Sequence, residues 1–515
     1  MSNQTSDNNK RIAKNTALLY IRMLFLMFIG LFTSRVNLQS LGVDNFGIYN
    51  VVGGVVAMFS ILTGSLGVAI SRDITFELGK GNMDKLNKVF SSAVTIQILM
   101  SILIVIVAEI AGVWFLNYKM VIPIDRLYAA NWVMQFSILS FVLSLISVPY
   151  NACIIAHEKM SAFAYITIYE AIMKLIVAYT VFVTPFDKLI TYAALLFFIA
   201  LSLRLIYGVY CARNFEECHF HFVFDRKMLK QMGGFAGWTM IGNLAYVGYS
   251  QGLNILLNLF FGPSVNAARG IAMQVNEKVS SFSTNFQMAL NPQITKSYAS
   301  NDLSRMHTLI FASSKYSFFM LLLLSLPIMV EAPSILHYWL GIVPEHTVWF
   351  VRLIFMILMV DAIANPLTVG AQAYGKIKRY QITLGCVSLL IVPISYVALK
   401  FLNMPEIVFV VHLSIVLLVQ CLRLYMVKDM INLSIIQYVK NVVVRILIVA
   451  SFSVVLPIIL HNYWPSTFIY MVLNCIVSCL CVASCIYLLG LNNNERQKIN
   501  SKIQFIIGGI LVKTK

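Results

Sequence analysis

The sequence predicts an all-α integral membrane protein with about 14 transmembrane helices, arranged as two six-helix lobes followed by two further helices. Of its 515 residues, 59% are hydrophobic and only 11% are charged, a composition far from that of a soluble domain. The apolar runs are uninterrupted and about 20 residues long, which favours helices over a barrel. Parts of the chain also repeat at an offset of about 220 residues, which predicts two related lobes.

The apolar runs place the spans in chain order. Their approximate limits are 17–38, 48–70, 89–115, 129–150, 162–183, 188–212, 235–258, 266–291, 309–330, 347–370, 381–402, 407–427, 441–461 and 467–490. The polar N-terminus has no apolar core before a cleavage site, so we expect the first span to direct insertion.

The basic residues support this map and require its eighth span, which carries several charges. With the N-terminus in the cytoplasm, inner segments hold about 24 Lys and Arg, and outer loops hold about 4. Without the eighth span, Lys376, Lys378 and Arg379 would lie outside, against the Lys/Arg bias. Cytoplasmic loops therefore account for the net charge of +17, and we expect no nucleic-acid partner.

The repeat is clearest after the fourth and tenth spans. Both places carry an identical Pro-x6-Ala-x2-Lys pattern, made by Pro149, Ala156 and Lys159 and again by Pro366, Ala373 and Lys376. A weaker match relates Ile74-Thr75 to Ile294-Thr295. Six spans per repeat give both halves one orientation, so we expect a pseudo-twofold axis along the membrane normal and a cleft between the lobes.

This repeat defines the expected domains. They are an N-terminal lobe at 1–212, a basic cytoplasmic hinge loop at 213–234, a C-terminal lobe at 235–428, two extra transmembrane helices at 429–490 and a cytoplasmic tail at 491–515. The end of the tail, 502–515, is expected to form a helix on the inner leaflet.

The eighth span carries a polar stripe. Five of its polar residues fall within about 40° of one line on a helix: Arg269, Asn276, Ser280, Ser283 and Gln287. A polar stripe inside a membrane protein faces water or a substrate, so we interpret this helix as one wall of a central cavity. Lys278 lies on the opposite face, and the pattern assigns it no role.

Two arginines in the first span leave two interpretations open. Arg22 lies about one turn from the inner end and Arg35 about one turn from the outer end. Each either extends to the membrane interface or faces the cavity, and the same alternatives hold for Arg269. On an ideal helix Arg22 and Arg35 are about 140° apart, so both face one cavity only if the helix bends.

Glu170, Lys174 and Asp361 are among the further charges inside spans, and each such charge costs roughly 2.5–3.5 kcal/mol at a helix centre. Glu170 and Lys174 are four residues apart in the fifth span, so they share a face and can neutralise each other. They are either an internal ion pair that fixes packing, or a proton or cation relay or substrate contact. Asp361, in the tenth span, could pair with a cavity arginine or carry a coupling ion. We treat all three as ion-coupling candidates.

The seventh span is amphipathic and includes Asn243 and Tyr246. Amide and aromatic side chains can bind sugar rings, but they also serve as contacts between helices. Cys218, His219 and His221 in the hinge loop resemble a metal cluster only superficially, and we expect no metal. No nucleophile motif, paired-carboxylate motif or phosphate loop is present, so we expect neither a cofactor nor enzymatic activity.

The stretches RIAKNTALLYIRMLF, RDITFELGKGN, VPYNACIIAHEKMSAFAYI and AQAYGKIKRYQ resemble the Wzx-type polysaccharide flippases of the multidrug/oligosaccharidyl-lipid/polysaccharide exporter superfamily. The resemblance covers essentially the whole length. It implies 12 to 14 helices in two six-helix lobes, alternating access, and export of undecaprenyl-pyrophosphate-linked oligosaccharide. Related flippases line their cavity with arginines on the first and eighth helices, and these correspond to Arg22, Arg35 and Arg269.

We therefore expect a transporter that moves lipid-linked oligosaccharide from the cytoplasmic to the periplasmic leaflet for surface polysaccharide assembly. The expected substrate-binding residues are Arg22, Arg35, Arg269, Asn276, Ser280, Asn243 and Tyr246. The expected partners are this lipid, membrane lipids and a polysaccharide polymerase, with a monomer in the bacterial inner membrane and both termini in the cytoplasm. The alternatives are a cation-coupled multidrug antiporter of the same superfamily and a membrane-embedded glycan-modifying enzyme.

Overall fold

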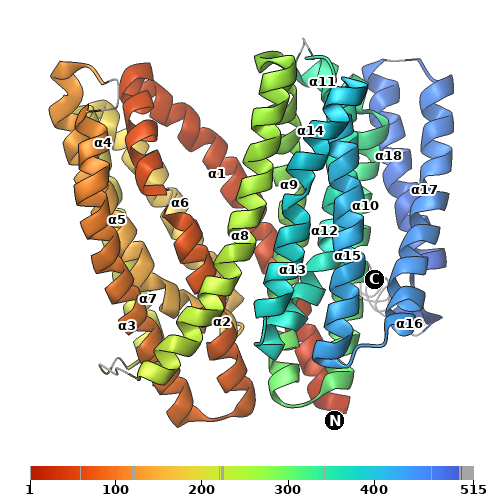
Figure 1. The fold of residues 1–515 in the computed structure, drawn as a ribbon, viewed down its shortest axis with the longest axis horizontal. Coiled ribbons are helices and arrows are strands. Elements are labelled where there is room, and N and C mark those ends of the chain that lie inside the picture. Colours follow the sequence, from red (N-terminus) through yellow and green to blue (C-terminus); the bar gives the residue numbers. More distant parts are fainter. Residues whose placement is uncertain are drawn as a thin grey trace, which may run out of the picture. The chain divides into compact units, whose positions relative to one another are not determined.

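A computed structural model describes residues 2–57, 59–118, 122–219, 221, 225–340, 343–465, 467–493, 495–497 and 500, and the regular structure of this part of the chain is entirely helical (Figure 1). Its α-helices are α1 (Ser2–Ala57), α2 (Ser60–Lys80), α3 (Met83–Val107), α4 (Val113–Tyr118), α5 (Ile124–Ala156), α6 (Met160–Val183), α7 (Lys188–Asn214), α8 (Arg226–Phe261), α9 (Pro263–Ala299), α10 (Leu303–Val330), α11 (Ala332–Leu340), α12 (Thr347–Tyr374), α13 (Lys378–Leu389), α14 (Ile391–Leu402), α15 (Ile407–Ile431), α16 (Ile435–Tyr438), α17 (Val444–Tyr463) and α18 (Phe468–Cys485). The predicted all-α fold class is confirmed. The expected surface helix at 502–515 lies outside the described residues.

Within the described residues, eleven helical segments are long and apolar enough to cross a membrane. Some combine two helices: α3 continues through the π-helical segment Ala108–Gly112 into α4. A second π-helical segment, Val439–Val443, joins α16 to α17 in the same way. A π-helical turn keeps its backbone groups hydrogen-bonded, so such a span remains satisfied in lipid. The chain is a multi-pass membrane protein.

The predicted spans 235–258 and 266–291 are not among these eleven segments, although both are helical. They lie inside α8 and α9, which are helices of 36 and 37 residues. At 1.5 Å per residue α9 extends for roughly 55 Å, more than the thickness of a bilayer core. Their polarity, and not their length, therefore separates these two helices from the other spans.

The expectation of one continuous helix at 48–70 was wrong. α1 ends at Ala57 and α2 begins at Ser60, and the Phe59 N–H donates to the Val56 carbonyl at 3.1 Å in the turn between them. Hydropathy does not detect this turn because the apolar residues continue through it. α1 also bends at Gly42, whose φ of 78° and ψ of 167° are accessible to glycine at little cost.

The described helices form two compact units, each built from more than one part of the chain. Unit 1 combines Met1–Val247 with Met288–Met306 and Val369–Gly385. Unit 2 combines Gly248–Gln287 with His307–Thr368 and the chain from Cys386 onward. Unit 1 therefore takes the ends of α9 and α12 from the second half of the chain. The domain limits drawn from the repeat remain a prediction.

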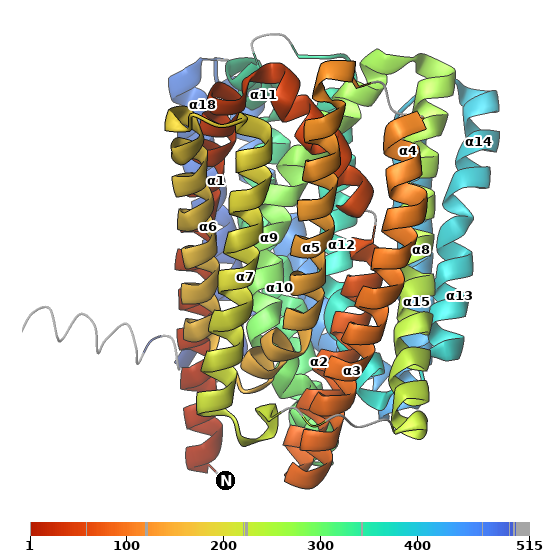
Figure 2. The ribbon, with the colours of Figure 1, turned by 90° about the vertical axis from the view of Figure 1, so that its left-hand side faces the viewer.

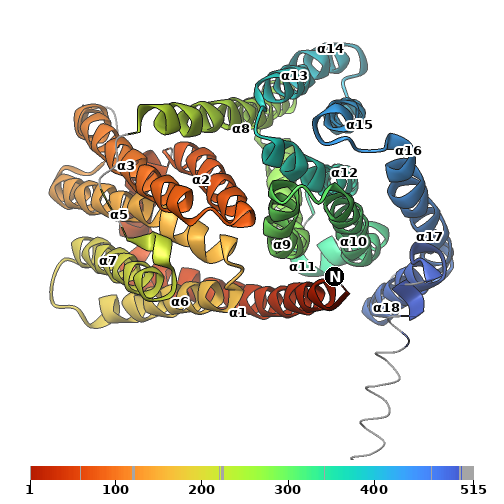
Figure 3. The same cartoon turned by 90° about the horizontal axis from the view of Figure 1, so that it is seen from below.

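Helix α5 is the centre of unit 1. It packs against α7, α2 and α3, and Figure 3 shows it between α3 and α7. Helix α1 lies beside α6, as Figure 2 shows from the side. The core between α1 and α5 is apolar, with Val52 of α1 and Ala130 and Val133 of α5 completely buried. This packing holds the polar face of α5 in a fixed position.

The repeated Pro-x6-Ala-x2-Lys pattern adopts the same backbone conformation at both of its positions. After α5 the chain takes a left-handed conformation at Glu158, with φ of 58°, and after α12 it does so at Gly375, with φ of 90°. Both residues lie nine positions after the proline, so the pattern encodes one type of helix ending. Glutamate is strained in this conformation. Contacts to the Glu158 carboxylate from Gln293 at 2.7 Å and Lys296 at 2.9 Å hold it there.

Arg72 of α2 holds the corresponding end of α12. Its guanidinium donates to the backbone carbonyls of Gln372 at 3.1 Å and Ala373 at 2.9 Å, and pairs with Asp73 at 2.5 Å. A cation at the C-terminus of a helix interacts favourably with its last carbonyls. Gly375 leaves room for this side chain, because a Cβ there would lie 2.6 Å from Arg72 Nη2.

Unit 2 attaches the helices after α15 through two buried charges. Glu331 Oε1 accepts from the Asn474 amide at 2.6 Å and lies 2.9 Å from His461 Nδ1, which connects the end of α10 with α17 and α18. Lys315 inside α10 donates to both oxygens of Glu495 at 2.8 Å. These contacts attach the end of α17, α18 and the segment after α18 to α10 and the residue that follows it.

Substitution of Gly375 by alanine should destabilise the protein more than the same change at two other glycines. Gly81 also has a positive φ of 72° but open space around its Cβ position, and Gly237 lies in α8 with open space and ordinary helical geometry. We expect a loss of about 1–2 kcal/mol for Gly81→Ala from backbone strain, and more for Gly375→Ala because its Cβ meets Arg72. Gly237→Ala should not lower the melting temperature measured in detergent. Equal melting temperatures for the Gly375 and Gly81 variants would contradict the contact with Arg72.

The Lys315–Glu495 ion pair should make stability depend on pH. Burial raises the pKa of Glu495, but hydrogen bonds from Lys315 and from the Asn492 N–H together with the Lys315 charge outweigh it and hold this pKa below its ordinary value. The pair therefore stabilises the protein above the ordinary glutamate pKa, and its contribution is lost as the pH falls through the lowered pKa.

At about pH 7, Glu495→Gln should cost on the order of 1–2 kcal/mol, since a hydrogen-bonded charge pair is broken. The difference in melting temperature between this variant and the parent should shrink as the pH falls below about 4. A difference that stays constant over this range would show that the carboxylate charge does not stabilise the contact.

Candidate functional site

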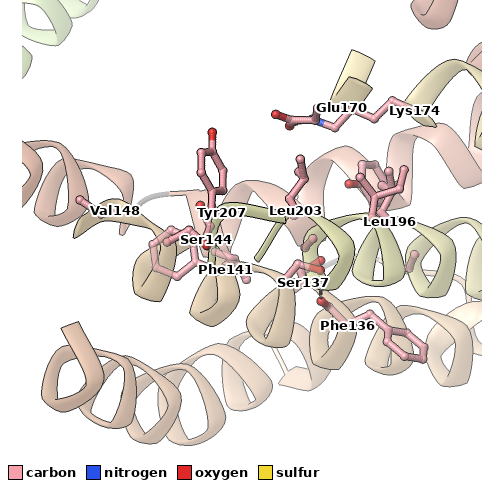
Figure 4. Close-up of a pocket in the computed structure, with 18 of the residues that line it drawn as sticks. Phe136, Ser137, Phe141, Ser144, Val148, Glu170, Lys174, Leu196, Leu203 and Tyr207 are labelled. Carbon is pink, nitrogen blue, oxygen red and sulfur yellow. Dashed lines mark hydrogen bonds and ion pairs between the residues drawn. The ribbon is translucent and has the colours of Figure 1, made fainter. Parts of the chain in front are cut away.

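A cavity of about 450 Å³ lies inside unit 1 between α1, α5, α6 and α7 (Figure 4). Figure 4 shows the ion pair of Glu170 and Lys174 along one wall and the side chains of α5 along another. Tyr49 of α1 and Tyr207 of α7 complete the polar lining. We call this space the α5 cavity. Its lining contains groups suited to a polar ligand.

A row of hydroxyl groups follows α5 along this cavity. Its members are Ser137, Ser140, Ser144 and Ser147, followed by Asn151. Their spacing of three and four residues places all five on one face of the helix. Ser140 and Ser147 donate to the carbonyls one turn earlier, at 2.7 and 2.8 Å. A serine that donates to its own helix still offers lone pairs to a ligand.

Glu170 and Lys174 form the expected ion pair, with 2.6 Å between Lys174 Nζ and Glu170 Oε1. Their side chains remain 35% and 48% exposed, so the pair borders open space instead of packed side chains. This exposure favours a role at the cavity over a purely internal packing contact. An acid and a base that neutralise each other also leave the cavity without a net negative charge.

Arg22 lies near the same cavity. Its guanidinium is 4.5 Å from the centre of the Phe163 ring of α6, and it interacts electrostatically with Tyr207, which lines the α5 cavity. A cation over an aromatic face is stabilised at low solvent exposure. Arg22 is half-buried, whereas Arg35 is exposed near the other end of the first helical part of α1. The structure thus brings Arg22, but not Arg35, close to the lining of the cavity.

A second cavity of unit 1, of about 370 Å³, lies between α2, α5, the end of α9 and the end of α12. Arg72 and Asn291 contribute its polar groups, and Asn151 lines both cavities. The two spaces therefore adjoin along α5. Arg72, already bound to the end of α12, adds a positive charge to this wall.

In unit 2 the polar stripe of α9 divides into two parts. Arg269 donates to the backbone carbonyl of Ser250 at 3.0 Å and to its hydroxyl at 3.2 Å, and Asn276 and Ser280 are half-buried. Ser283 and Gln287 are buried. The Gln287 amide donates to Ser317 at 3.0 Å and to the Ala362 carbonyl at 2.9 Å.

The lower part of the stripe is therefore a packed contact with α10 and α12, and only Arg269, Asn276 and Ser280 remain candidates for a cavity wall. Polar residues on one helix face satisfy two different needs here, and periodicity alone does not distinguish them. The partners of Gln287 lie on helices that are distant in sequence.

Arg269 belongs to a small polar group in unit 2. It acts electrostatically on His412 of α15, and the His412 ring lies 5.1 Å from the ring of Tyr249. Asp361 of α12 is exposed and interacts electrostatically with Arg423 of α15. Arg423 is therefore the candidate for the predicted arginine partner of Asp361.

The two residues predicted from the seventh span lie in the part of α8 that belongs to unit 1. The Asn243 amide donates to the Ser65 hydroxyl of α2 at 2.9 Å. Tyr246 is 55% exposed. Asn243 therefore makes the kind of contact between helices that was left open as its alternative role, while Tyr246 has an exposed ring. Lys278 and Glu277 are both exposed on α9.

The hinge-loop cysteine lies in a setting that differs from the sequence expectation. Cys218 is buried beside Cys153 of α5 and Cys211 of α7, whereas His219 and His221 are exposed. The sequence reasoning also did not identify the serine row of α5, although its three- and four-residue spacing was visible. It did not identify Arg72 because the partners of that side chain lie 300 residues away.

The family model described as "Polysaccharide biosynthesis protein" matches residues 12–298. A comparison with curated proteins finds no match for this chain.

Solved transporter structures share the fold at low sequence identity. An outward-facing multidrug resistance MATE family transporter of the MOP superfamily aligns with a TM-score of 0.69 and 12% identity, over 82% of this chain and 96% of that one. A MATE protein in its bent conformation gives a TM-score of 0.72 at 12% identity, over 83% and 96%. A MOP superfamily transporter from Pyrococcus furiosus gives 0.63 at 13%, over 82% and 96%. The fold is that of MOP superfamily transporters.

The Glu170–Lys174 pair should contribute little to stability. Pairs of this spacing at such exposure contribute roughly 0.3–0.5 kcal/mol. In a double-mutant cycle with Glu170→Gln and Lys174→Met, we expect a coupling energy of about this size from melting temperatures in detergent. A coupling energy several times larger would identify the pair as a packing element and argue against its role at the cavity.

Proposed function

The chain belongs to the polysaccharide biosynthesis protein family, and we propose that it moves an oligosaccharide linked to undecaprenyl pyrophosphate across the bacterial inner membrane. The family match over residues 12–298 is the observation that carries the proposal, because it identifies polysaccharide synthesis as the process served. The transporter fold supplies the type of activity. The described cavities supply groups that suit such a cargo.

The cargo has an anionic head, which requires cationic groups in the transport path. Arg22 near the α5 cavity and Arg269 in the polar group of unit 2 provide guanidinium groups of low exposure. A guanidinium can donate two parallel hydrogen bonds to a phosphate, and it stays charged when buried. Lys174 and Arg72 are further cationic side chains in the lining of the cavities in unit 1, and each pairs with a nearby acid, Glu170 or Asp73.

The sugars of the cargo require polar and aromatic surface. The serine row of α5 and the rings of Tyr49 and Tyr207 offer both. The volume of about 450 Å³ falls within the roughly 300–1,000 Å³ that is typical of small-ligand sites, so the α5 cavity can accommodate part of a head group. The polyprenyl tail remains in lipid throughout.

Alternating access provides the mechanism. The loaded head group enters from the cytoplasmic side, and rearrangement of the two lobes opens the path to the other side. A membrane potential that is negative inside favours outward movement of an anion by about 2.3 kcal/mol per charge per 100 mV. Glu170, Lys174 and Asp361 are the groups through which the return step would couple to a cation. In this scheme both termini and the loop at 213–234 lie in the cytoplasm.

A cation-coupled multidrug antiporter is the second candidate, because the structural relatives include MATE transporters. A cationic drug requires a net acidic cavity. In the α5 cavity Glu170 is neutralised by Lys174, which argues against this function. The relative from Pyrococcus furiosus is described as having a binding pocket of reverse polarity that suggests a different function.

Depletion of the protein in its host should separate these functions. For a flippase, lipid-linked oligosaccharide accumulates in the cytoplasmic leaflet and surface polysaccharide is lost, because the cargo no longer reaches the assembly enzymes. The measurement is leaflet-specific labelling of the extracted lipid. Normal surface polysaccharide together with increased sensitivity to cationic dyes would overturn the proposal and support the drug antiporter.

Removal of either proposed pyrophosphate-binding arginine, Arg22 or Arg269, should reduce export while the protein remains in the membrane. We expect Arg22→Ala and Arg269→Ala to lower surface polysaccharide by roughly tenfold or more, since a charge-assisted hydrogen bond contributes about 1.5–3 kcal/mol. Lysine at either position should restore part of the export because the charge returns without the second donor. Arg213→Ala is the control, since this arginine is exposed at the end of α7. Full export by the Arg269→Ala protein at normal expression would exclude its proposed contact with the pyrophosphate.

A further inference from the structure

Three buried cysteines meet at one end of unit 1. Cys153 lies in the last turn of α5, Cys211 in the last turn of α7, and Cys218 in the short 3-10 helix Glu216–Cys218 that follows α7. Cys153 and Cys211 are completely buried, and Cys218 is 5% exposed. We call this group, together with Glu217, the hinge cluster, because it stands where the loop between α7 and α8 begins.

Three ligand atoms of the hinge cluster are close enough to bind one ion. Sγ of Cys153, Sγ of Cys218 and a carboxylate oxygen of Glu217 all lie within 4.8 Å of one another. The thiol of Cys218 is also within hydrogen-bonding reach of both other cysteines. A tetrahedral zinc ion with Zn–S bonds of about 2.3 Å has sulfur atoms about 3.8 Å apart. Cys211, whose thiol contacts that of Cys218, is the candidate for the fourth ligand.

His157, which is not part of the hinge cluster, contacts the Glu217 carboxylate. His157 Nε2 lies 2.5 Å from Glu217 Oε1, and the His157 ring stacks on Phe215 with 4.2 Å between centres. His157 is four residues after Cys153, so both side chains leave α5 on the same face. Metal-binding carboxylates are commonly fixed by such a hydrogen-bonded neighbour.

Apolar packing accounts for the three buried thiols but not for the acid beside them. A buried cysteine alone behaves as a small apolar residue. Glu217 is only 3% exposed, and its pairing with His157 keeps a carboxylate buried directly beside the thiols. Three thiols and a carboxylate at this separation form the donor set that zinc prefers over harder cations.

We propose that Cys153, Cys211, Cys218 and Glu217 bind one zinc ion, with His157 holding the carboxylate in position. Binding releases the three thiol protons to solvent and breaks the present hydrogen bond from the Cys211 thiol to the Tyr150 carbonyl at 3.5 Å. The ion joins the ends of α5 and α7 to the first residues of the loop between α7 and α8. It thereby fixes where the connection to the second half of the chain begins, a structural role separate from the cargo path.

The metal content of the purified full-length protein tests this site. Protein prepared in detergent with a phosphine reductant and without chelator should contain about one zinc per chain by inductively coupled plasma mass spectrometry. Cys218→Ser and Cys153→Ser should reduce this value severalfold. Cys386→Ser and Cys421→Ser are the matched controls, because both cysteines are exposed in unit 2, and each should retain the metal.

A second measurement on the unmodified protein covers the case in which the cysteine variants fail to fold. After removal of metal by a chelator, addition of cadmium should produce ultraviolet thiolate-to-metal charge-transfer absorbance that saturates at one equivalent. It should also raise the melting temperature. Parent protein that neither retains zinc nor takes up cadmium would overturn the proposal. Mass spectrometry that finds a disulfide between two of the three cysteines under the same reducing conditions would do so as well.

Discussion

A charged or polar group inside a membrane protein needs a partner within the protein, because lipid provides none. Three contacts show how the described helices meet this requirement. Lys315 inside α10 pairs with Glu495 beyond the last helix. The strained Glu158 is held by Lys296, and Glu331 accepts hydrogen bonds from the last two long helices. In each case a buried charge determines which distant segment packs against it, so these few contacts direct the assembly of an otherwise apolar molecule.

The same requirement distinguishes the cavities from the core. Where helices pack closely, polar side chains have protein partners, as Gln287 does on α10 and α12. Around the α5 cavity Ser137, Ser140, Ser144 and the Glu170–Lys174 pair remain accessible, whereas Ser147 is buried. Polar groups that stay accessible deep in a hydrophobic protein are therefore the best indication of where a cargo travels.

How much of the site could be predicted depends on how far apart in sequence its members are. The pairing of Glu170 with Lys174 followed from their spacing, because both lie on one helix. The position of Arg22 over Phe163 did not, since it depends on how α1 packs against α6. The serine row could have been found from its spacing of three and four residues, but a hydropathy average over the apolar α5 does not detect it. The hinge cluster had no usable spacing, because its cysteines come from two helix ends and a loop.

The sequence by itself determined the fold class, the membrane location and most of the spans, because each depends on composition and periodicity within a short window. It also contained the repeated Pro-x6-Ala-x2-Lys pattern, and the structure shows that this pattern ends a helix at Glu158 and again at Gly375. Only the tertiary structure decided where the apolar run at 48–70 turns and which polar groups meet. Lys315 and Glu495 are 180 residues apart, and no local pattern can specify such a contact. It forms only when packing brings the two groups together, because a buried charge is more stable beside an opposite charge than unpaired in the protein interior.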